Sequence, residues 1–101
     1  MSQAYVALLL IDLHFPDAGS LKAKRKELQS VKAQLQGRLG AAVSEVDHHD
    51  LWQRATLAAA LTGGQLGALE RRADTVERWL VDRFEDTVSI RRSVTSVEDI
   101  G

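Results

Sequence analysis

Cysteine is absent from this chain of 101 residues, which excludes disulfide bonds, thiolate metal sites and a cysteine nucleophile. Long apolar runs are also absent. The run that begins at Ala4 is broken by Asp12, well short of the about 20 residues that a membrane-spanning helix needs. No basic segment precedes that run, so we expect no secretion signal and a cytoplasmic protein. The only proline, Pro16, lies in a turn, and no linker or repeat divides the chain, so we expect one domain over residues 1–101.

A strong excess of one charge is lacking as well, because the net charge is −1, and this argues against a general nucleic-acid binder. The charges are nevertheless unevenly distributed along the chain. Residues 20–40 contain one acidic side chain, Glu27, and six basic ones: Lys22, Lys24, Arg25, Lys26, Lys32 and Arg38. Such an asymmetry is informative about partners rather than about the fold.

The hydrophobic period alternates along the chain between that of strands and that of helices. The segments follow the order strand, helix, strand, strand, helix, strand: residues 4–14, 20–39, 41–47, 54–62, 65–84 and 86–97. Consecutive strands tend to pair and crossovers are right-handed, so this order predicts an α+β, ferredoxin-like βαββαβ sandwich. Its four-stranded antiparallel sheet would carry two helices on one face, with the apolar strands 4–14 and 54–62 in the centre.

In such a sandwich the second face of the sheet is open, yet both faces of strand 4–14 are apolar. The second face of strand 54–62 carries Thr56, Ala58, Ala60 and Thr62, which are small and nearly apolar. Exposed patches of this kind mark interaction surfaces. We therefore predict a homodimer, or a protein partner, on the open sheet face. The alternative is that the connection 48–53, with Trp52, folds over that face.

Histidines and carboxylates cluster in Asp47-His48-His49-Asp50, and His14 and Asp12 end the first strand. Adjacent residues on a turn point in divergent directions, and the spacing is not that of a zinc site, so we expect no metal. No Ser–His–Asp spacing, phosphate loop or carboxylate pair accompanies them, so we expect no catalytic residues, no cofactor and no enzyme. A small-ligand site formed by His14, His48 and His49 remains the alternative.

The first two turns of helix 20–39 carry four cations, Lys22, Lys24, Arg25 and Lys26. A helix N-terminus is the positive end of the macrodipole, so each cation there is disfavoured by up to about 1 kcal/mol. An external anion such as an RNA phosphate would compensate for this arrangement, whereas screening by salt is the alternative explanation. Trp52 and Arg54 could stack on bases near the same surface, or Trp52 could cover the core.

Two stretches of this sequence resemble the YlxP-like family of small bacterial proteins of unknown function. They are Ser20-Leu21-Lys22-Ala23-Lys24-Arg25 and Glu45-Val46-Asp47-His48-His49-Asp50-Leu51-Trp52-Gln53-Arg54-Ala55. The similarity also includes the Leu-His-Phe-Pro end of the opening strand and extends over nearly the whole chain. Members tend to have Glu in place of Ala23 and Gln in place of His49.

The resemblance implies a ferredoxin-like fold and a cytoplasmic protein with no established activity. Genes of this family often lie beside those of translation and ribosome-maturation factors, although a fold does not determine a function. The interpretation that we favour is therefore a non-enzymatic accessory protein that binds RNA or a ribosomal subunit through the basic helix end. The competing hypothesis is a dimeric small-ligand or protein-binding module.

Overall fold

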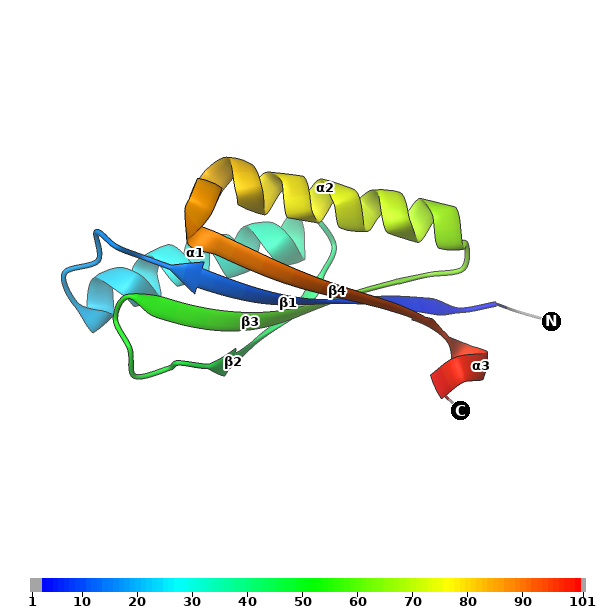
Figure 1. Cartoon of the computed structure of the whole chain (residues 1–101), viewed down its shortest axis with the longest axis horizontal. Helices are drawn as coiled ribbons and strands as arrows, with labels where there is room; N and C mark the ends of the chain where they lie inside the picture. Colours follow the sequence, from blue (N-terminus) through cyan, green and yellow to red (C-terminus); the bar gives the residue numbers. More distant parts are fainter. Residues whose placement is uncertain (1–2, 101) are drawn as a thin grey trace.

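The chain forms four strands and two long helices (Figure 1). The strands and the helices alternate along the chain in the order that the hydrophobic periods of the sequence predict. The structure is a computed structural model that describes residues 3–100. Its elements are β1 (Tyr5–His14), α1 (Leu21–Gly37), β2 (Ala42–Asp47), β3 (Arg54–Gly63), α2 (Leu66–Phe84), a 3-10 turn (Glu85–Thr87), β4 (Val88–Ser96) and α3 (Val97–Ile100).

The strands form one sheet in the order β2-β3-β1-β4, and each neighbouring pair is antiparallel. The predicted α+β chain with a four-stranded antiparallel sheet is confirmed. The two apolar strands, β1 and β3, are central, and the more polar β2 and β4 are at the edges. Edge positions suit polar strands because only one of their sides pairs.

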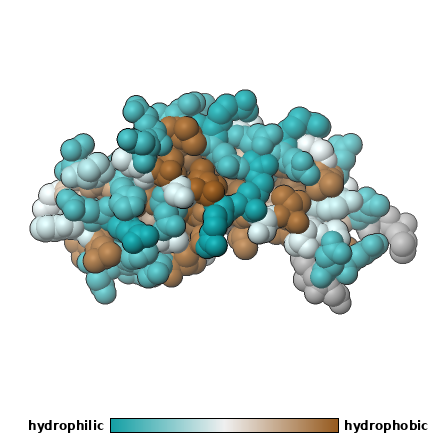
Figure 2. Space-filling view, viewed as in Figure 1, coloured by the Kyte–Doolittle hydropathy of each residue, from teal (hydrophilic) through white to brown (hydrophobic). Residues whose placement is uncertain are grey.

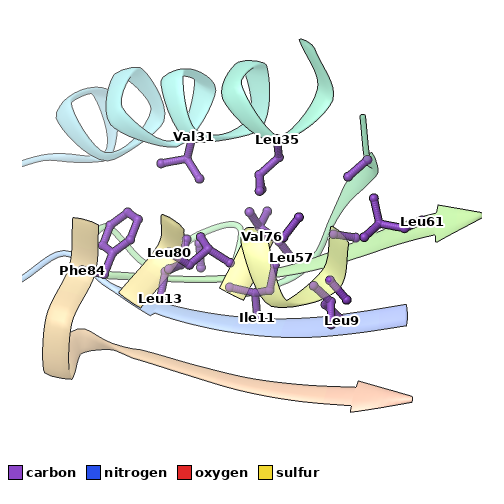
Figure 3. Packing of buried hydrophobic residues seen from close by; sticks show 14 of the residues in the cluster. Leu9, Ile11, Leu13, Val31, Leu35, Leu57, Leu61, Val76, Leu80 and Phe84 are labelled. Atoms are coloured by element: carbon purple, nitrogen blue, oxygen red, sulfur yellow. The ribbon is translucent and has the colours of Figure 1, made fainter. Parts of the chain in front are cut away.

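The core lies between one face of the sheet and the two long helices (Figure 3). Alternate residues of β1 are fully buried, and so are alternate residues of β3, as period-2 side-chain direction requires. The helices contribute an apolar stripe each, and all of these side chains form one cluster. Its largest hydrophobic members include Leu9, Ile11, Leu13, Val31, Leu35, Leu57, Leu61, Val76, Leu80 and Phe84.

The second face of the sheet, which we call the open face, is not covered by the helices. Cross-strand partners share a face, so the pairing places Leu8 beside Ala60 and Leu10 beside Ala58 on it. Leu8 is 47% exposed. The connection 48–53 therefore leaves the middle of this face uncovered, and Trp52 itself is 51% exposed. The connection covers only one end of the face, where the ring of His48 lies against Thr56.

A β-bulge interrupts β2 where it pairs with β3. Glu45 lies opposite Leu57, whereas Asp47 lies opposite Thr56, so Val46 is an additional residue on this strand. Leu57 is buried beneath the helices and Thr56 belongs to the open face. The bulge therefore directs Glu45 toward the helices and Asp47 toward the open face.

The end of the chain differs from the prediction. The last strand was expected over residues 86–97 and only two helices were expected, but β4 is Val88–Ser96 and a third, one-turn helix α3 follows. The hydroxyl of Ser96 accepts from the backbone N–H of Asp99 at 3.4 Å and donates to its carboxylate at 3.0 Å. This local cap stabilises a helical turn over a continued strand.

Arg92 connects β4 to α2 through ion pairs with Asp74, at 2.8 Å, and with Glu77. Burial lowers the pKa of Arg92, but the hydrogen bonds and charges of the two carboxylates raise it more, so the pKa lies above its ordinary value.

Among residues 3–100, no helix is long and apolar enough to cross a membrane.

Candidate functional site

Lys24, in the first turns of α1, is the largest fully buried side chain of the described residues, with 1% of its surface exposed. Its ammonium donates to two backbone carbonyls, that of His48 at 2.7 Å and that of Leu51 at 2.5 Å. The carboxylate of Glu45 is 3.7 Å away. A buried charge is tolerated only when it is paired and hydrogen-bonded, and these three groups meet that requirement.

The prediction that Lys24 contacts an external anion is therefore withdrawn, because its ammonium is enclosed and already bonded. The carbonyls of His48 and Leu51 and the carboxylate of Glu45 instead compensate the charge of Lys24 from within the protein. The other three cations of these turns, Lys22, Arg25 and Lys26, are exposed to solvent. Ser20 caps the helix, its hydroxyl accepting from the N–H of Ala23 at 3.1 Å.

The connection 48–53 is held against α1 and β1 by backbone contacts. Lys24 binds two of its carbonyls, and a third, that of Gln53, accepts from the N–H of Phe15 at 2.8 Å. Two apolar side chains of the same connection, Leu51 and Trp52, nevertheless remain about half exposed, at 49% and 51%. Their backbone is fixed while their side chains face water, so this segment is a candidate contact surface.

His48, the first residue of the connection, is tied to the protein by three bonds. Its carbonyl binds Lys24, its N–H donates to the carboxylate of Asp47 at 2.7 Å, and its ring nitrogen Nδ1 lies 2.8 Å from Thr56 Oγ1. Its φ is 63°, in the left-handed region that few non-glycine residues adopt. Together the three bonds stabilise this turn conformation.

A hydrogen-bond chain links His48 to the first strand. The hydroxyl of Thr56 donates to the carboxylate of Asp12 at 2.7 Å. That hydroxyl has a single proton, so it accepts from His48, and Nδ1 of His48 carries the proton. The guanidinium of Arg54 lies 3.6 Å from the same carboxylate. This hydrogen-bond chain positions the connection and Arg54.

The three histidines considered as a ligand site have different surroundings. His48 turns toward Thr56, and His49 is exposed on the connection. His14 pairs with Arg54 at the end of β1 and lines a cavity of about 240 Å³ with Glu27, Arg83 and residues of the turn before β4. Within residues 3–100, no three His, Asp or Glu side chains are grouped as metal ligands would be.

A larger cavity, of about 370 Å³, lies at the far end of the sheet between β1, α2 and α3. Tyr5, Leu66, Val97 and Glu70 are among the residues that line it. The predicted site residues do not line this cavity, so it is separate from the surface formed by α1 and the connection.

Sequence reasoning missed the structural roles of Glu45, Thr56 and Asp12, and the burial of Lys24. One signal for Lys24 was available, because it continues the apolar stripe of α1 formed by Leu21, Leu28, Val31 and Leu35. The bonds of Thr56 depend on strand register and on the bulge, and neither is visible in residue types alone.

Residues 6–92 match the family model described as "Protein of unknown function (DUF503)". The chain is 30% identical over 82 residues to the "Uncharacterized protein YlxP" of Bacillus subtilis (strain 168), covering 81% of this chain and 85% of that protein. A solved structure, "De novo designed protein Foldit4", is similar with a TM-score of 0.61 at 9% identity, covering 91% and 96% of the two chains, and shows the fold alone. The chain therefore belongs to the DUF503 family, and its resemblance to YlxP-like proteins is confirmed.

Proposed function

We propose that this protein is a non-enzymatic accessory protein that binds RNA, free or in a ribosomal subunit, in the cytoplasm. The contact surface consists of Lys22, Arg25 and Lys26 on α1 together with Trp52 and Arg54. One observation carries the proposal. The buried Lys24 fastens the connection with the exposed Trp52 directly to the helix turns that carry the exposed cations.

The cations provide the electrostatic part of this interaction. Lys22, Arg25 and Lys26 are exposed on the first two turns of a 17-residue helix. Phosphates favour both cationic side chains and the positive end of the helix dipole. Three phosphate contacts on a single strand correspond to a slope of about −2 when the logarithm of affinity is plotted against that of the salt concentration.

Trp52 provides the second part, because an exposed indole can stack on a base of any identity. Its backbone is already ordered by the bonds of the adjacent Leu51 and Gln53 carbonyls, so RNA binding would cost little loop entropy. Arg54, the first residue of β3, pairs with Asp12 and can contribute a further phosphate or stacking contact.

The open face is a less suitable RNA surface. Four-stranded RNA-binding sheets stack bases on aromatic side chains of the central strands. Here the open-face positions of β1 are Val6, Leu8, Leu10, Asp12 and His14, and those of β3 are Arg54, Thr56, Ala58, Ala60 and Thr62. Neither set contains Phe, Tyr or Trp, so the end of the sheet beside Trp52 is the better site.

We also propose that the fold is a ferredoxin-like sandwich, because the strand order and the order of the elements along the chain are those of this fold.

The test is co-sedimentation with purified ribosomal subunits at low and high salt. We expect the protein to pellet at low salt and less so at high salt. The variant Lys22→Ala/Arg25→Ala/Lys26→Ala should lose most of the pelleted fraction. A matched control, Arg38→Ala/Arg71→Ala/Arg78→Ala, removes as many exposed cations elsewhere and should pellet like the parent protein. Equal loss in both triple variants, or no pelleting of the parent protein, would sink the RNA assignment.

We also propose that the protein forms a homodimer through the open face, and that this dimer is the form that binds RNA. The observation that favours it is the exposed Leu8 in the middle of that face, beside the half-buried Leu10, Ala58 and Ala60. Sedimentation equilibrium measures the mass directly. A dimer without RNA binding would support the alternative function as a small-ligand or protein-binding module.

A further inference from the structure

We propose that a second copy of this chain covers the open face about a two-fold axis that runs along the strands between β1 and β3. This rests on the proposed self-association and specifies its geometry.

We call two neighbouring sets of side chains in the centre of the open face the ridge and the groove, after their sizes. The ridge is Leu8 and Leu10 of β1, and the groove is formed by the smaller Ala60 and Ala58, which lie opposite them on β3. A cavity of about 540 Å³ lies on the other side of the ridge, lined by Leu8, Leu10 and residues of β4. In the view of Figure 1, with α2 above and β4 in front, Figure 2 shows hydrophobic residues in several separate places among hydrophilic ones.

A two-fold axis along the strands, between β1 and β3, exchanges these two strands. Leu10 of one copy then lies over Ala58 of the second copy, and Leu8 lies over Ala60. Each ridge fills the groove of the other copy, and the same contact occurs twice, as an isologous interface requires. A two-fold axis across the strands would instead place β1 over β1, with leucine against leucine and alanine facing alanine across a gap.

The charges of the edge strands favour the same axis. Arg91 on β4 and Ser44 on β2 lie in the row of Leu10 and Ala58, at opposite edges of the open face. The axis along the strands places β4 of one copy over β2 of the other, so Arg91 approaches Ser44 and the neighbouring Asp47. The axis across the strands would bring Arg91 close to Arg91 of the second copy, which like charges oppose.

The area is sufficient for a modest interface. Three strands have nine or ten residues and β2 has six, and with a rise of about 3.3 Å per residue and a spacing of about 4.8 Å the face covers about 550 Å². This plane of about 550 Å², roughened by side chains, approaches the about 800 Å² per partner of a standard interface. Aligned sheets pack with their strands within about 30° of each other, which this axis permits.

The axis also determines where the two RNA-binding surfaces lie. A rotation about the strand direction leaves the ends of the sheet in place, so both copies present Trp52 and the start of α1 at the same end of the dimer. An RNA segment could then contact both copies at once, and the second contact would be intramolecular. An axis across the strands would place the two surfaces at opposite ends.

The test uses single cysteines, because the chain has none of its own. Ala42 on β2 and Ser93 on β4 are exposed residues of one row at opposite edges of the open face. Face-to-face sheets lie about 10 Å apart, too far for a disulfide but within reach of a bis-maleimide of similar length. Ala42→Cys and Ser93→Cys proteins are treated with this reagent separately and as an equal mixture. Denaturing gels then measure the cross-linked fraction, and sedimentation equilibrium of each protein measures its mass.

We expect the proteins to sediment as dimers and the equal mixture to yield cross-linked dimers, with little or none from either variant alone. Efficient cross-linking within Ala42→Cys or Ser93→Cys alone would overturn the axis while leaving self-association intact. A dimer in which neither the mixture nor the single variants cross-link would overturn the face itself. A monomer at all concentrations would remove self-association, and with it this geometry.

Discussion

The Nζ atom of Lys24 lies 2.7 Å from the carbonyl oxygen of His48, a residue 24 positions later in the chain. This bond joins the first turns of α1 to the connection between β2 and β3. The same ammonium reaches Leu51, so one side chain fixes two points of that connection. The proposed RNA surface consists of side chains from these two segments, and its geometry therefore depends on a residue that RNA would not touch.

Replacing Lys24 with Met should lower the free energy of unfolding by about 2 kcal/mol, because two buried carbonyls lose their donor while the apolar stem is kept. Urea denaturation followed by circular dichroism measures the change. Lys26→Met, at an exposed position of the same helix, is the control and should change stability by less than about 0.5 kcal/mol. Equal stabilities of the two variants would mean that the Lys24 bonds contribute nothing.

Replacing Thr56 with Val preserves shape but removes the hydroxyl that donates to Asp12 and accepts from His48. We expect a loss of about 1–2 kcal/mol in stability, since both partners lose a bond at a position that is 5% exposed. Hydrogen exchange of the 48–53 amides should become faster. Thr62→Val, at an exposed position on the same face of β3, should leave that exchange unchanged.

Replacing Trp52 with Ala should weaken binding of single-stranded RNA by about 1–3 kcal/mol, the range for loss of one base-stacking aromatic. The indole is 51% exposed, so thermal stability should change little. Fluorescence anisotropy with a labelled RNA measures the affinity. Val81→Ala, a half-exposed apolar residue on α2, is the control. A Trp52→Ala protein that binds RNA as tightly as the parent would exclude stacking at this position.

Replacing Ala58 with Leu should weaken the proposed dimer, because the introduced leucine side chain of one copy would meet Leu10 of the other. Overpacking of this kind costs about 1–3 kcal/mol, which corresponds to an increase of about 5- to 140-fold in the dissociation constant. The double variant Leu10→Ala/Ala58→Leu exchanges ridge and groove and should restore the dimer. Sedimentation equilibrium measures both constants. Failure of the double variant to recover would argue against this pairing of β1 with β3 of the second copy.

The elements were predictable to within one or two residues because the sequence marks them consistently. Ser20 caps α1, and the alternation in β1 and β3 places the residues that face the helices on one side and the open-face residues on the other. The helix α3 was missed, because Ser96 and Asp99 form a local cap that competes with an extended strand. Hydrophobic period contains no information about such a cap.

The candidate site was predictable in its residues but not in their roles. Lys24 was expected to face solvent like its neighbours, because lysine rarely lies in a core. The compensating groups, Glu45 and the carbonyls of the connection, come from more than 20 residues away in the chain. Whether a charged side chain is buried depends on such distant partners. A single sequence contains these residues but does not indicate which of them are in contact in the fold.

The additional residue in β2 has a consequence for how this segment can vary in length. Side-chain parity changes at Val46, so Glu45 and Asp47 point to opposite sides of the sheet although they are two positions apart. Deleting Val46 would make Glu45 and Asp47 adjacent, and simple alternation would still direct them to opposite sides of the sheet. The bulge therefore lets β2 hold one additional residue while Glu45 stays on the side of Lys24 and Asp47 on the side of Thr56.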